Sequence, residues 1–256
     1  YLNNIEKLNP KINSIVSIKN KNEIIEEAEK KSNTKFCGLP IAVKDLSDVV
    51  GFPTTYGYPG TKNYNPRKNS LFVDKLLEAG ITIIGKTNTA ELGVGGQTIN
   101  RLFGPTSNVY DISKCAAGSS GGASTAVASG MLPFADGTDQ MGSCRAPAAF
   151  ANIYGFRPTT GLIASDRTFQ DPKIPVLTTP GCFAKTPEDM SLLLDSIVGS
   201  NNNDPLSFDL ENKFEFSNLT DKEFSNIKLV LLEDVIEKYH FEKGIIEMCK
   251  NKLNKI

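Results

Sequence analysis

The chain has 256 residues, of which 39% are hydrophobic and 22% are charged, as is ordinary for a globular protein. Its 28 basic and 29 acidic residues give a net charge of −1, which predicts no broad electrostatic field for nucleic acid or an acidic membrane. A chain of this length buries a sizeable core, as one large α/β domain or as two smaller ones.

The cysteines and the lengths of the apolar runs indicate the cellular compartment in which the protein works. The five cysteines are odd in number, scattered and without a C-x-x-C pair, which argues against a disulfide framework or a zinc site and favours a reducing compartment. No apolar run reaches the roughly 18 residues of a membrane helix. We therefore expect a cytoplasmic protein without direct contact to nucleic acid or membrane. The chain begins at Tyr1 rather than methionine, which leaves a targeting segment, and with it an organelle, open.

The first predicted elements alternate between helix and strand. Residues 20–31 are rich in Glu and Lys and predict an exposed helix. The apolar run 39–43 follows a glycine and predicts a buried strand that ends at Lys44. A loop rich in Gly and Pro then occupies residues 51–66.

The next two elements complete a strand–helix–strand unit. An amphipathic helix is indicated by apolar residues on one side, namely Leu71, Val73, Leu76 and Leu77. It ends at Ala79-Gly80, and the β-branched run 81–84 predicts a strand. This order favours an α/β sheet with helices on its faces.

Two helices are predicted in the middle of the chain. Small residues over 121–131 predict a helix packed closely on a sheet, with a Gly-Ser-Ser-Gly-Gly loop at its start. Thr186 and Pro187 supply an N-cap and a first-position proline for a helix over 190–198.

The last part of the chain changes character. Residues 200–222 lose periodicity and predict a surface connection. The run 227–232 predicts a further strand, followed by a helix rich in Lys and Glu to the end. The chain would thus stop just after a new βα unit, 223–256, begins, which is typical of a truncated sequence.

Glycine-rich loops present the candidate nucleophiles, Ser119 and Ser143. A serine attacks an amide only if a base removes its proton. The sole histidine, His240, lies in a charged segment and is best interpreted as a solvated surface residue, which disfavours a Ser-His-Asp mechanism. Lys44 is the alternative base, although most lysines are solvated. Its pKa would have to fall from about 10.4 towards 7, a difference of roughly 4–5 kcal/mol that burial could supply.

The two glycine-rich loops have other interpretations. A flexible linker or a phosphate-binding loop also uses Gly and Ser. A nucleotide-binding P-loop requires a lysine that is absent here, and a linker would not lead directly into an apolar helix. In the segment 137–143, a turn before a helix would direct successive N–H groups at one point, which makes an oxyanion hole.

Together these segments resemble the amidase signature family of Ser–Ser–Lys hydrolases. The match covers most of residues 36–199. It comprises Gly38-Leu39-Pro40-Ile41-Ala42-Val43-Lys44-Asp45, Gly85-Lys86-Thr87-Asn88, Gly104-Pro105-Thr106 followed by Asn108, Gly118-Ser119-Ser120-Gly121-Gly122, Gly137-Thr138-Asp139, Gly142-Ser143 with Arg145, and Gly155-Phe156-Arg157-Pro158-Thr159. The resemblance implies a three-layer α/β/α fold with a twisted mixed β-sheet and one amidase domain over residues 1–256. It also implies that no metal and no organic cofactor takes part.

By the same resemblance, the catalytic residues form a relay. Ser143 matches the nucleophile that becomes an acyl-ester, and Ser119 matches a bridging serine that follows a cis peptide bond. Lys44 matches the base, which in its neutral form takes the proton of Ser143 through Ser119. The relay then returns the proton to the leaving amine.

The resemblance also assigns residues around the relay. The oxyanion hole would be formed by the backbone N–H groups of Gln140, Met141, Gly142 and Ser143. Three further residues would support the site or, equally, only shape the loop and cap its helix: Ser120, Asp139 and Arg145.

The chain departs from the family pattern at several places. Ala117 and Ala123 replace a glycine and a serine of the usual Gly-Gly-Ser-Ser-Gly-Gly-Ser motif. Gln140-Met141 replaces the common Thr-Gly, which adds bulk near the acyl pocket and bears on the substrate rather than on the chemistry. Cys144 replaces an aliphatic residue and is interpreted as a packing residue.

These residues predict an amidase that hydrolyses a small carboxamide to an acid and ammonia or an amine. The first alternative is the A subunit of the glutamyl-tRNA(Gln) amidotransferase, whose nucleophile loop usually reads Thr-Gly-Gly-Ser-Ile-Arg-Gln-Pro. The second alternative is a catalytically silent binding or scaffold protein. The substrate stays open, and so does the oligomeric state, with a homodimer as one option.

Overall fold

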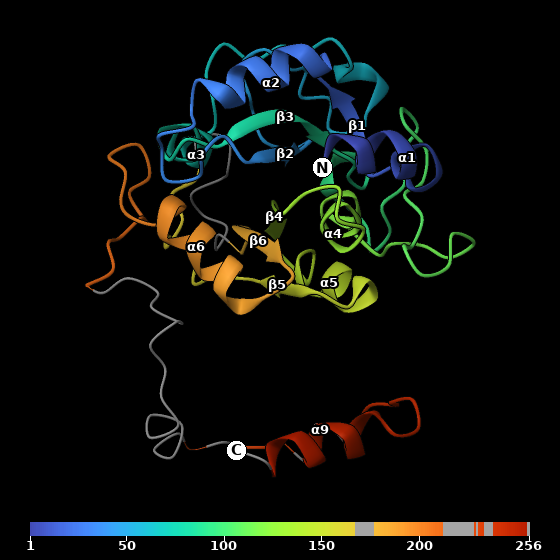
Figure 1. Ribbon diagram of the computed structural model, residues 1–256. Coiled ribbons are helices and arrows are strands. Elements are labelled where there is room, and N and C mark those ends of the chain that lie inside the picture. Colours follow the sequence, from blue (N-terminus) through green and yellow to red (C-terminus); the bar gives the residue numbers. More distant parts are fainter. Residues whose placement is uncertain (167–176, 212–227, 229, 233–237, 255–256) are drawn as a thin grey trace. The chain divides into compact units, whose positions relative to one another are not determined.

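The computed structural model describes residues 1–166, 177–211, 228, 230–232 and 238–254. The chain divides into two compact units, Tyr1–Phe214 and Glu215–Ile256. In the first unit (Figure 1) the helices are α1 (Leu2–Ile12), α2 (Lys21–Glu29), α3 (Leu71–Glu78), α4 (Gly121–Ala128), α5 (Arg145–Ala151) and α6 (Pro187–Ile197). The strands are β1 (Ile15–Ile18), β2 (Pro40–Lys44), β3 (Thr82–Thr87), β4 (Phe134–Asp139), β5 (Tyr154–Phe156) and β6 (Thr179–Ala184), with 3₁₀ turns at Pro59–Thr61 and Glu91–Gly93.

The strands pair in two three-stranded sheets. In the first sheet, of order β1-β3-β2, β1 runs antiparallel and β2 parallel to β3. In the second, of order β4-β6-β5, both pairings are antiparallel. The two sheets meet where β2 lies beside β4, and there the carboxylate of Asp136 accepts a hydrogen bond from the Lys44 backbone N–H at 3.0 Å.

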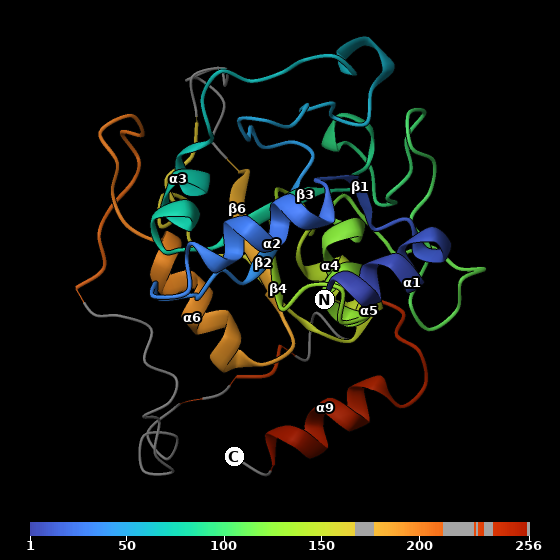
Figure 2. The same cartoon turned by 45° about the horizontal axis from the view of Figure 1, so that its top comes forward.

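Helices cover both faces of these sheets. Ile41 and Val43 of β2 belong to a buried cluster that includes residues of α3 and α6. Ala42, between them, belongs to a second cluster with residues of α1, α2 and α4. Because successive side chains of a strand point to opposite faces, the two clusters lie on opposite sides of β2. In Figure 2, α3 and α6 are seen to one side of β2, and α1 and α4 to the other. The expected three-layer α/β/α arrangement is therefore confirmed.

The structure confirms the predicted start of α6 and changes the predicted apolar face of α3 at one position. In α6, the Thr186 side chain accepts a hydrogen bond from the Asp189 N–H at 3.1 Å, and Pro187 occupies the first turn, as predicted. In α3, Phe72 is buried and Leu77, which was predicted on the inner side, is 36% exposed. The buried stripe of this short helix therefore runs through Phe72 rather than Leu77.

Helix α4 is buried along most of its length because its residues are small. A Cβ atom on Gly122 would lie 2.4 Å from the Asn88 backbone nitrogen, so only glycine allows α4 to approach the end of β3 this closely. This approach places the loop before α4, with Ser119 and Ser120, beside the two sheets.

The second unit contains α9 (Ile245–Leu253), which agrees with the predicted terminal helix. The predicted strand over 227–232 is not seen, since residues 228 and 230–232 pair with no described strand and 227 and 229 lie outside the described residues. His240 is exposed. In the predicted connection, 200–211 holds turns, and 212–222 lies outside the described part. Over the described ranges no helix is long and apolar enough to cross a membrane.

Candidate active site

The side chain of Lys44 lies at the centre of a cluster of hydroxyl groups. Its Nζ donates to Ser119 Oγ at 2.8 Å, to Ser120 Oγ at 2.7 Å and to Thr138 Oγ1 at 2.8 Å. Lys44 ends β2, the two serines precede α4, and Thr138 lies on β4, so three distant segments supply the cluster. The structure thus brings Lys44 and Ser119 together, and adds Thr138, to which the sequence analysis assigned no role.

The surroundings of Lys44 favour the neutral amine. The side chain is 0% exposed. Burial lowers the pKa of Lys44 to about 8, against the opposing influence of the carboxylates of Asp136 and Asp139. The three groups that touch Nζ are neutral hydroxyls, which can donate to an amine as well as accept from an ammonium. An amine at this position can therefore act as a base near neutral pH.

The loop that carries Ser119 is held by neighbouring backbone and side-chain groups. Its Gly118–Ser119 peptide bond is cis, as the resemblance implied. The Ser119 carbonyl accepts from the Ala90 N–H at 3.1 Å, and Thr98 Oγ1 accepts from the Gly121 N–H at 2.8 Å. These contacts fix the position of the Ser119 hydroxyl relative to Lys44.

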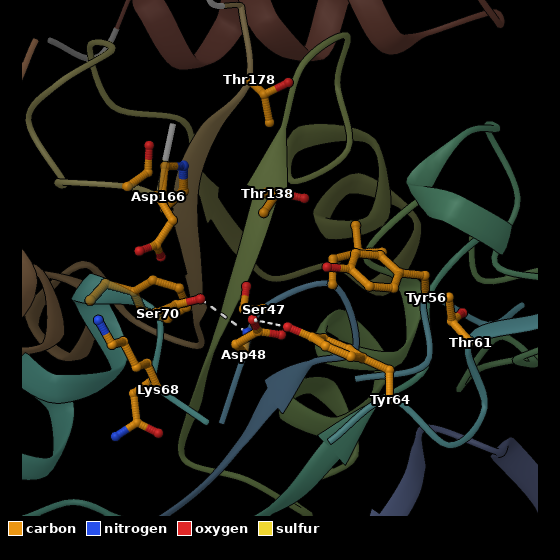
Figure 3. Close-up of a pocket in the computed structure, with 15 residues that line it drawn as sticks. Ser47, Asp48, Tyr56, Thr61, Tyr64, Lys68, Ser70, Thr138, Asp166 and Thr178 are labelled. Atoms are coloured by element: carbon orange, nitrogen blue, oxygen red, sulfur yellow. Dashed lines mark hydrogen bonds between the residues drawn. The ribbon is translucent and has the colours of Figure 1, made fainter. Parts of the chain in front are cut away.

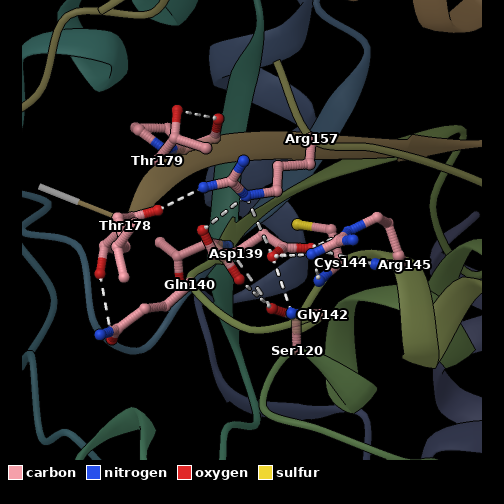
Figure 4. Close-up of polar contacts among 12 residues, drawn as sticks. Ser120, Asp139, Gln140, Gly142, Cys144, Arg145, Arg157, Thr178 and Thr179 are labelled. Atoms are coloured by element: carbon pink, nitrogen blue, oxygen red, sulfur yellow. Dashed lines mark hydrogen bonds and ion pairs between the residues drawn. The ribbon is translucent and has the colours of Figure 1, made fainter. Parts of the chain in front are cut away.

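Asp139 organises the loop that leads to α5 (Figure 4). Its carboxylate accepts from the backbone N–H groups of Gly142 at 2.8 Å and Cys144 at 3.0 Å. Arg145 donates to both carboxylate oxygens, at 3.1 and 3.0 Å, and Arg157 Nε lies 3.3 Å from Oδ1. Burial opposes ionisation of Asp139, but the hydrogen bonds from Arg145, Cys144 and Gly142 outweigh it and lower the pKa to about 2.

This arrangement changes the expected set of oxyanion donors. The Gly142 N–H already has Asp139 as its acceptor. The N–H groups of Gln140, Met141 and Ser143 have no acceptor among the described residues. Ser143 is partly exposed, and its Oγ forms no hydrogen bond to any residue that the structure describes, Ser119 included. Catalytic hydrogen bonds in free enzymes are often long and shorten when substrate binds.

Cys144 adjoins Ser143 but has the character of a packing residue. It is 0% exposed and belongs to a hydrophobic cluster. Burial raises the pKa of the Cys144 thiol far above its usual range, so the thiolate does not form. A Cβ atom on Gly137 would lie 2.9 Å from Cys144 Sγ, which shows how closely the thiol packs on β4.

A cavity of about 620 Å³ adjoins the hydroxyl cluster (Figure 3). Thr138, a partner of Lys44, lies in its wall, and so does Thr178, whose hydroxyl donates to the Gln140 side chain at 3.2 Å. Elsewhere in the wall Tyr64 donates to Asp48 Oδ2 at 3.2 Å. The wall of the cavity therefore contains one hydrogen-bond partner of Lys44 and one of Gln140. In the described part of the chain, no group of His, Cys, Asp or Glu side chains is arranged to hold a metal ion.

Comparison with known sequences identifies the chain's relatives. A family model described as Amidase matches residues 1–254. The A subunit of a glutamyl-tRNA(Gln) amidotransferase from Sulfolobus acidocaldarius is 35% identical over 237 residues, which cover 91% of this chain and 49% of that protein. An acylamidase from Rhodococcus erythropolis is 37% identical over 213 residues, which cover 80% of this chain and 44% of that protein.

Solved structures give the same result. A bacterial aryl acylamidase of the amidase signature family superposes with a TM-score of 0.77 at 30% identity, over 83% of this chain and 46% of that one. The A subunit of the glutamyl-tRNA(Gln) amidotransferase from Thermotoga maritima superposes with a TM-score of 0.70 at 28% identity, over 83% and 45%. The chain spans about half the length of the curated relatives it matches. With a family model that matches nearly the whole chain, and with motifs and fold in agreement, this chain belongs to the amidase signature family.

Proposed function

We propose that the protein carrying this chain hydrolyses a small carboxamide to a carboxylic acid and ammonia or an amine. The observation that carries the proposal is the buried Lys44, whose Nζ contacts three hydroxyls, one of them Ser119. A buried lysine without a directly bound carboxylate is suited to be a base rather than an ion-pair partner. The acyl-ester would form on Ser143.

The proposed proton path runs from Ser143 through Ser119 to Lys44. A neutral lysine amine has one lone pair and two N–H donors. The lone pair would accept the Ser119 proton, while the N–H groups remain donors to Ser120 and Thr138. As Ser119 takes the proton of Ser143, Ser143 Oγ bonds to the carbonyl carbon. The proton then returns to the leaving nitrogen, the C–N bond breaks, and water hydrolyses the ester by the same path.

The loop after β4 would stabilise the oxyanion of the tetrahedral intermediate. The N–H groups of Gln140, Met141 and Ser143 are the proposed donors, since Gly142 donates to Asp139. The pairing of Asp139 with Arg145 would keep the loop in place. Donors that are fixed before the reaction stabilise the developing charge without reorganisation.

The cavity beside Thr138 is the proposed place for the part of the substrate that does not react. Its volume, about 620 Å³, falls within the range of small-molecule sites. Two of the threonines in its wall contact groups assigned to the reaction: Thr138 contacts Lys44, and Thr178 contacts Gln140.

A second candidate function is that of the A subunit in a glutamyl-tRNA(Gln) amidotransferase, the name that several relatives carry. Such a protein would release ammonia from glutamine and work with partner proteins. Ammonia release from glutamine, compared with release from simple amides, separates the two functions. The cluster around Lys44 argues against a catalytically silent scaffold.

The proposal also includes a cytoplasmic location and a homodimer. The five cysteines are free, which supports a reducing compartment. Sedimentation of the purified protein tests the homodimer.

The nucleophile can be tested without knowledge of the substrate. Ser143→Ala should abolish labelling of the intact protein by a fluorophosphonate probe, because the probe needs the Ser143 hydroxyl to displace fluoride. Peptide mass spectrometry should find the label on Ser143. His240→Ala and Cys144→Ala, as matched controls, should retain labelling. Labelling that survives in Ser143→Ala, or that disappears in a folded His240→Ala variant, would contradict the proposal.

A further inference from the structure

Asp136 lies buried at the junction of the two sheets, in the middle of β4. It is 2% exposed. Its Oδ1 accepts from the Lys44 backbone N–H at 3.0 Å, whereas Oδ2 has no hydrogen-bond partner in the described part of the chain. The neighbouring N–H of Asp45 donates to Thr87 on β3. The Lys44 N–H therefore points away from β3, and Asp136 supplies the acceptor that the facing strand would otherwise provide.

A carboxylate is a costly acceptor at this position. Burial of a charge is unfavourable unless other charges compensate for it. A neutral side chain such as asparagine could accept the same hydrogen bond from Lys44. The negative charge of Asp136 therefore calls for a second role, which the neighbouring charges indicate.

Four titratable groups of the surrounding elements act on Asp136: Lys44 of β2, Lys86 of β3, Cys144 before α5 and Cys182 of β6. Two further carboxylates lie near these lysines, Asp45 beside Lys86 and Asp139 near Lys44. Lys86 and Asp45 pair with each other, and Asp139 pairs with Arg145. Burial keeps both cysteines as neutral thiols. Within this group of described residues, the charges left without an ion-pair partner are those of Lys44 and Asp136.

We infer that Asp136 is a positioning residue for Lys44: its Oδ1 fixes the backbone of the lysine, and its negative charge stabilises the lysine's ammonium form. The inference rests on the proposed function, in which Lys44 is the base. It assigns to this one carboxylate both the placement of the base and the pH at which the base becomes available.

The pKa values show the direction of the charge effect. Burial raises the pKa of Asp136 to about 6, against the hydrogen bond from the Lys44 N–H and the attraction of the two lysines. Above that pH Asp136 is ionised, and it opposes the loss of the Lys44 proton. Without the carboxylate, the pKa of Lys44 should fall, and the neutral base should be present at lower pH.

Two substitutions separate the charge of Asp136 from its hydrogen bond. Asp136→Asn removes the charge and keeps an oxygen for the Lys44 N–H, whereas Asp136→Leu removes both. The readout is the rate of fluorophosphonate labelling of Ser143 in the intact protein as a function of pH. Labelling forms the Oγ–P bond, breaks the P–F bond and passes the Ser143 proton to Lys44, so its midpoint reports the lysine. Asp74→Asn, at an exposed site on α3, is the matched control.

Both variants should shift the midpoint of the labelling rate down by about one pH unit, because one buried charge is lost. Only the Leu variant should also lower the plateau rate, by about tenfold, because the Lys44 N–H loses its acceptor. An unchanged midpoint in Asp136→Asn overturns the charge role, and an unchanged plateau in Asp136→Leu overturns the positioning role. If Leu fails to fold, Asp136→Ala, which also lacks both the charge and the acceptor, takes its place. Labelling in Ser143→Ala would instead refute the proposed function itself.

Discussion

Two buried lysines on neighbouring strands differ in their partners. Lys44 of β2 and Lys86 of β3 are both 0% exposed. The register pairs Val43 with Lys86 and Lys44 with Thr87, so the two side chains point to opposite faces of the sheet. Lys44 contacts hydroxyls, whereas Lys86 donates to the Ser47 carbonyl and lies 3.7 Å from the Asp45 carboxylate.

The comparison shows that burial alone does not make a lysine a base. Burial lowers the pKa of both lysines. For Lys86 the carboxylate of Asp45 opposes this effect most strongly, and an ammonium paired with a carboxylate has no reason to lose its proton. The described groups in contact with Lys44 Nζ are neutral, so the neutral amine keeps all its hydrogen bonds. The groups that contact each lysine therefore make Lys86 a structural ammonium ion and Lys44 a candidate base.

The largest effects should come from replacing each lysine by methionine. Lys44→Met should lower fluorophosphonate labelling by about 10³-fold, the scale of a lost general base. Lys86→Met should lower the free energy of unfolding by about 3–5 kcal/mol, because Asp45 would remain buried and unpaired. The labelling rate per folded molecule should then be retained. Urea unfolding and labelling kinetics of both variants measure the two effects.

The opposite results for the two variants would contradict the roles assigned to Lys44 and Lys86. A Lys86→Met protein that folds stably but is not labelled would place Lys86 in the reaction. A Lys44→Met protein that is labelled normally would remove Lys44 from it. Because no carboxylate of the described residues contacts Lys44 Nζ directly, its loss should cost less stability than the loss of Lys86.

Smaller effects should come from one hydroxyl in each cluster. Thr138→Val removes one contact of Lys44 Nζ and should lower the labelling rate about tenfold, since the amine is held less firmly. Thr54→Val, the matched control, removes the 3.2 Å contact of Lys86 Nζ and should cost about 1 kcal/mol of stability without slowing labelling. Equal labelling rates in the two variants would show that Thr138 does not serve the base.

Several local elements could be predicted from the sequence because their signals are local. The apolar run before Lys44, the capping residue Thr186 and the small residues of α4 each specify an element by periodicity or capping. The division into two sheets could not be predicted in this way. It depends on β2 and β4 lying side by side, and the contact between Lys44 and Asp136 joins residues 92 positions apart.

Some residues of the candidate site could likewise be predicted from sequence motifs, whereas others are recognised only in the folded structure. Motif resemblance named Lys44, Ser119 and Ser143, and the structure places the first two within hydrogen-bond distance, while the role of each stays a prediction. Thr138 lies inside a matched motif, but a threonine in a strand most often only packs, so no signal marked it. Asp136 carries no local signal at all, since its importance arises from its position at the junction of the two sheets.

The role of neutral Lys44 as the base can be tested by the pH dependence of Ser143 labelling in the intact protein. If neutral Lys44 is the base, the fluorophosphonate rate should rise with pH, with a midpoint at about 8, and this rise should be absent in Lys44→Met. The sign follows from the chemistry, because the protonated amine cannot accept a proton. A rate that does not depend on pH, or a rise in the same range that persists in Lys44→Met, would show that Lys44 is not the base.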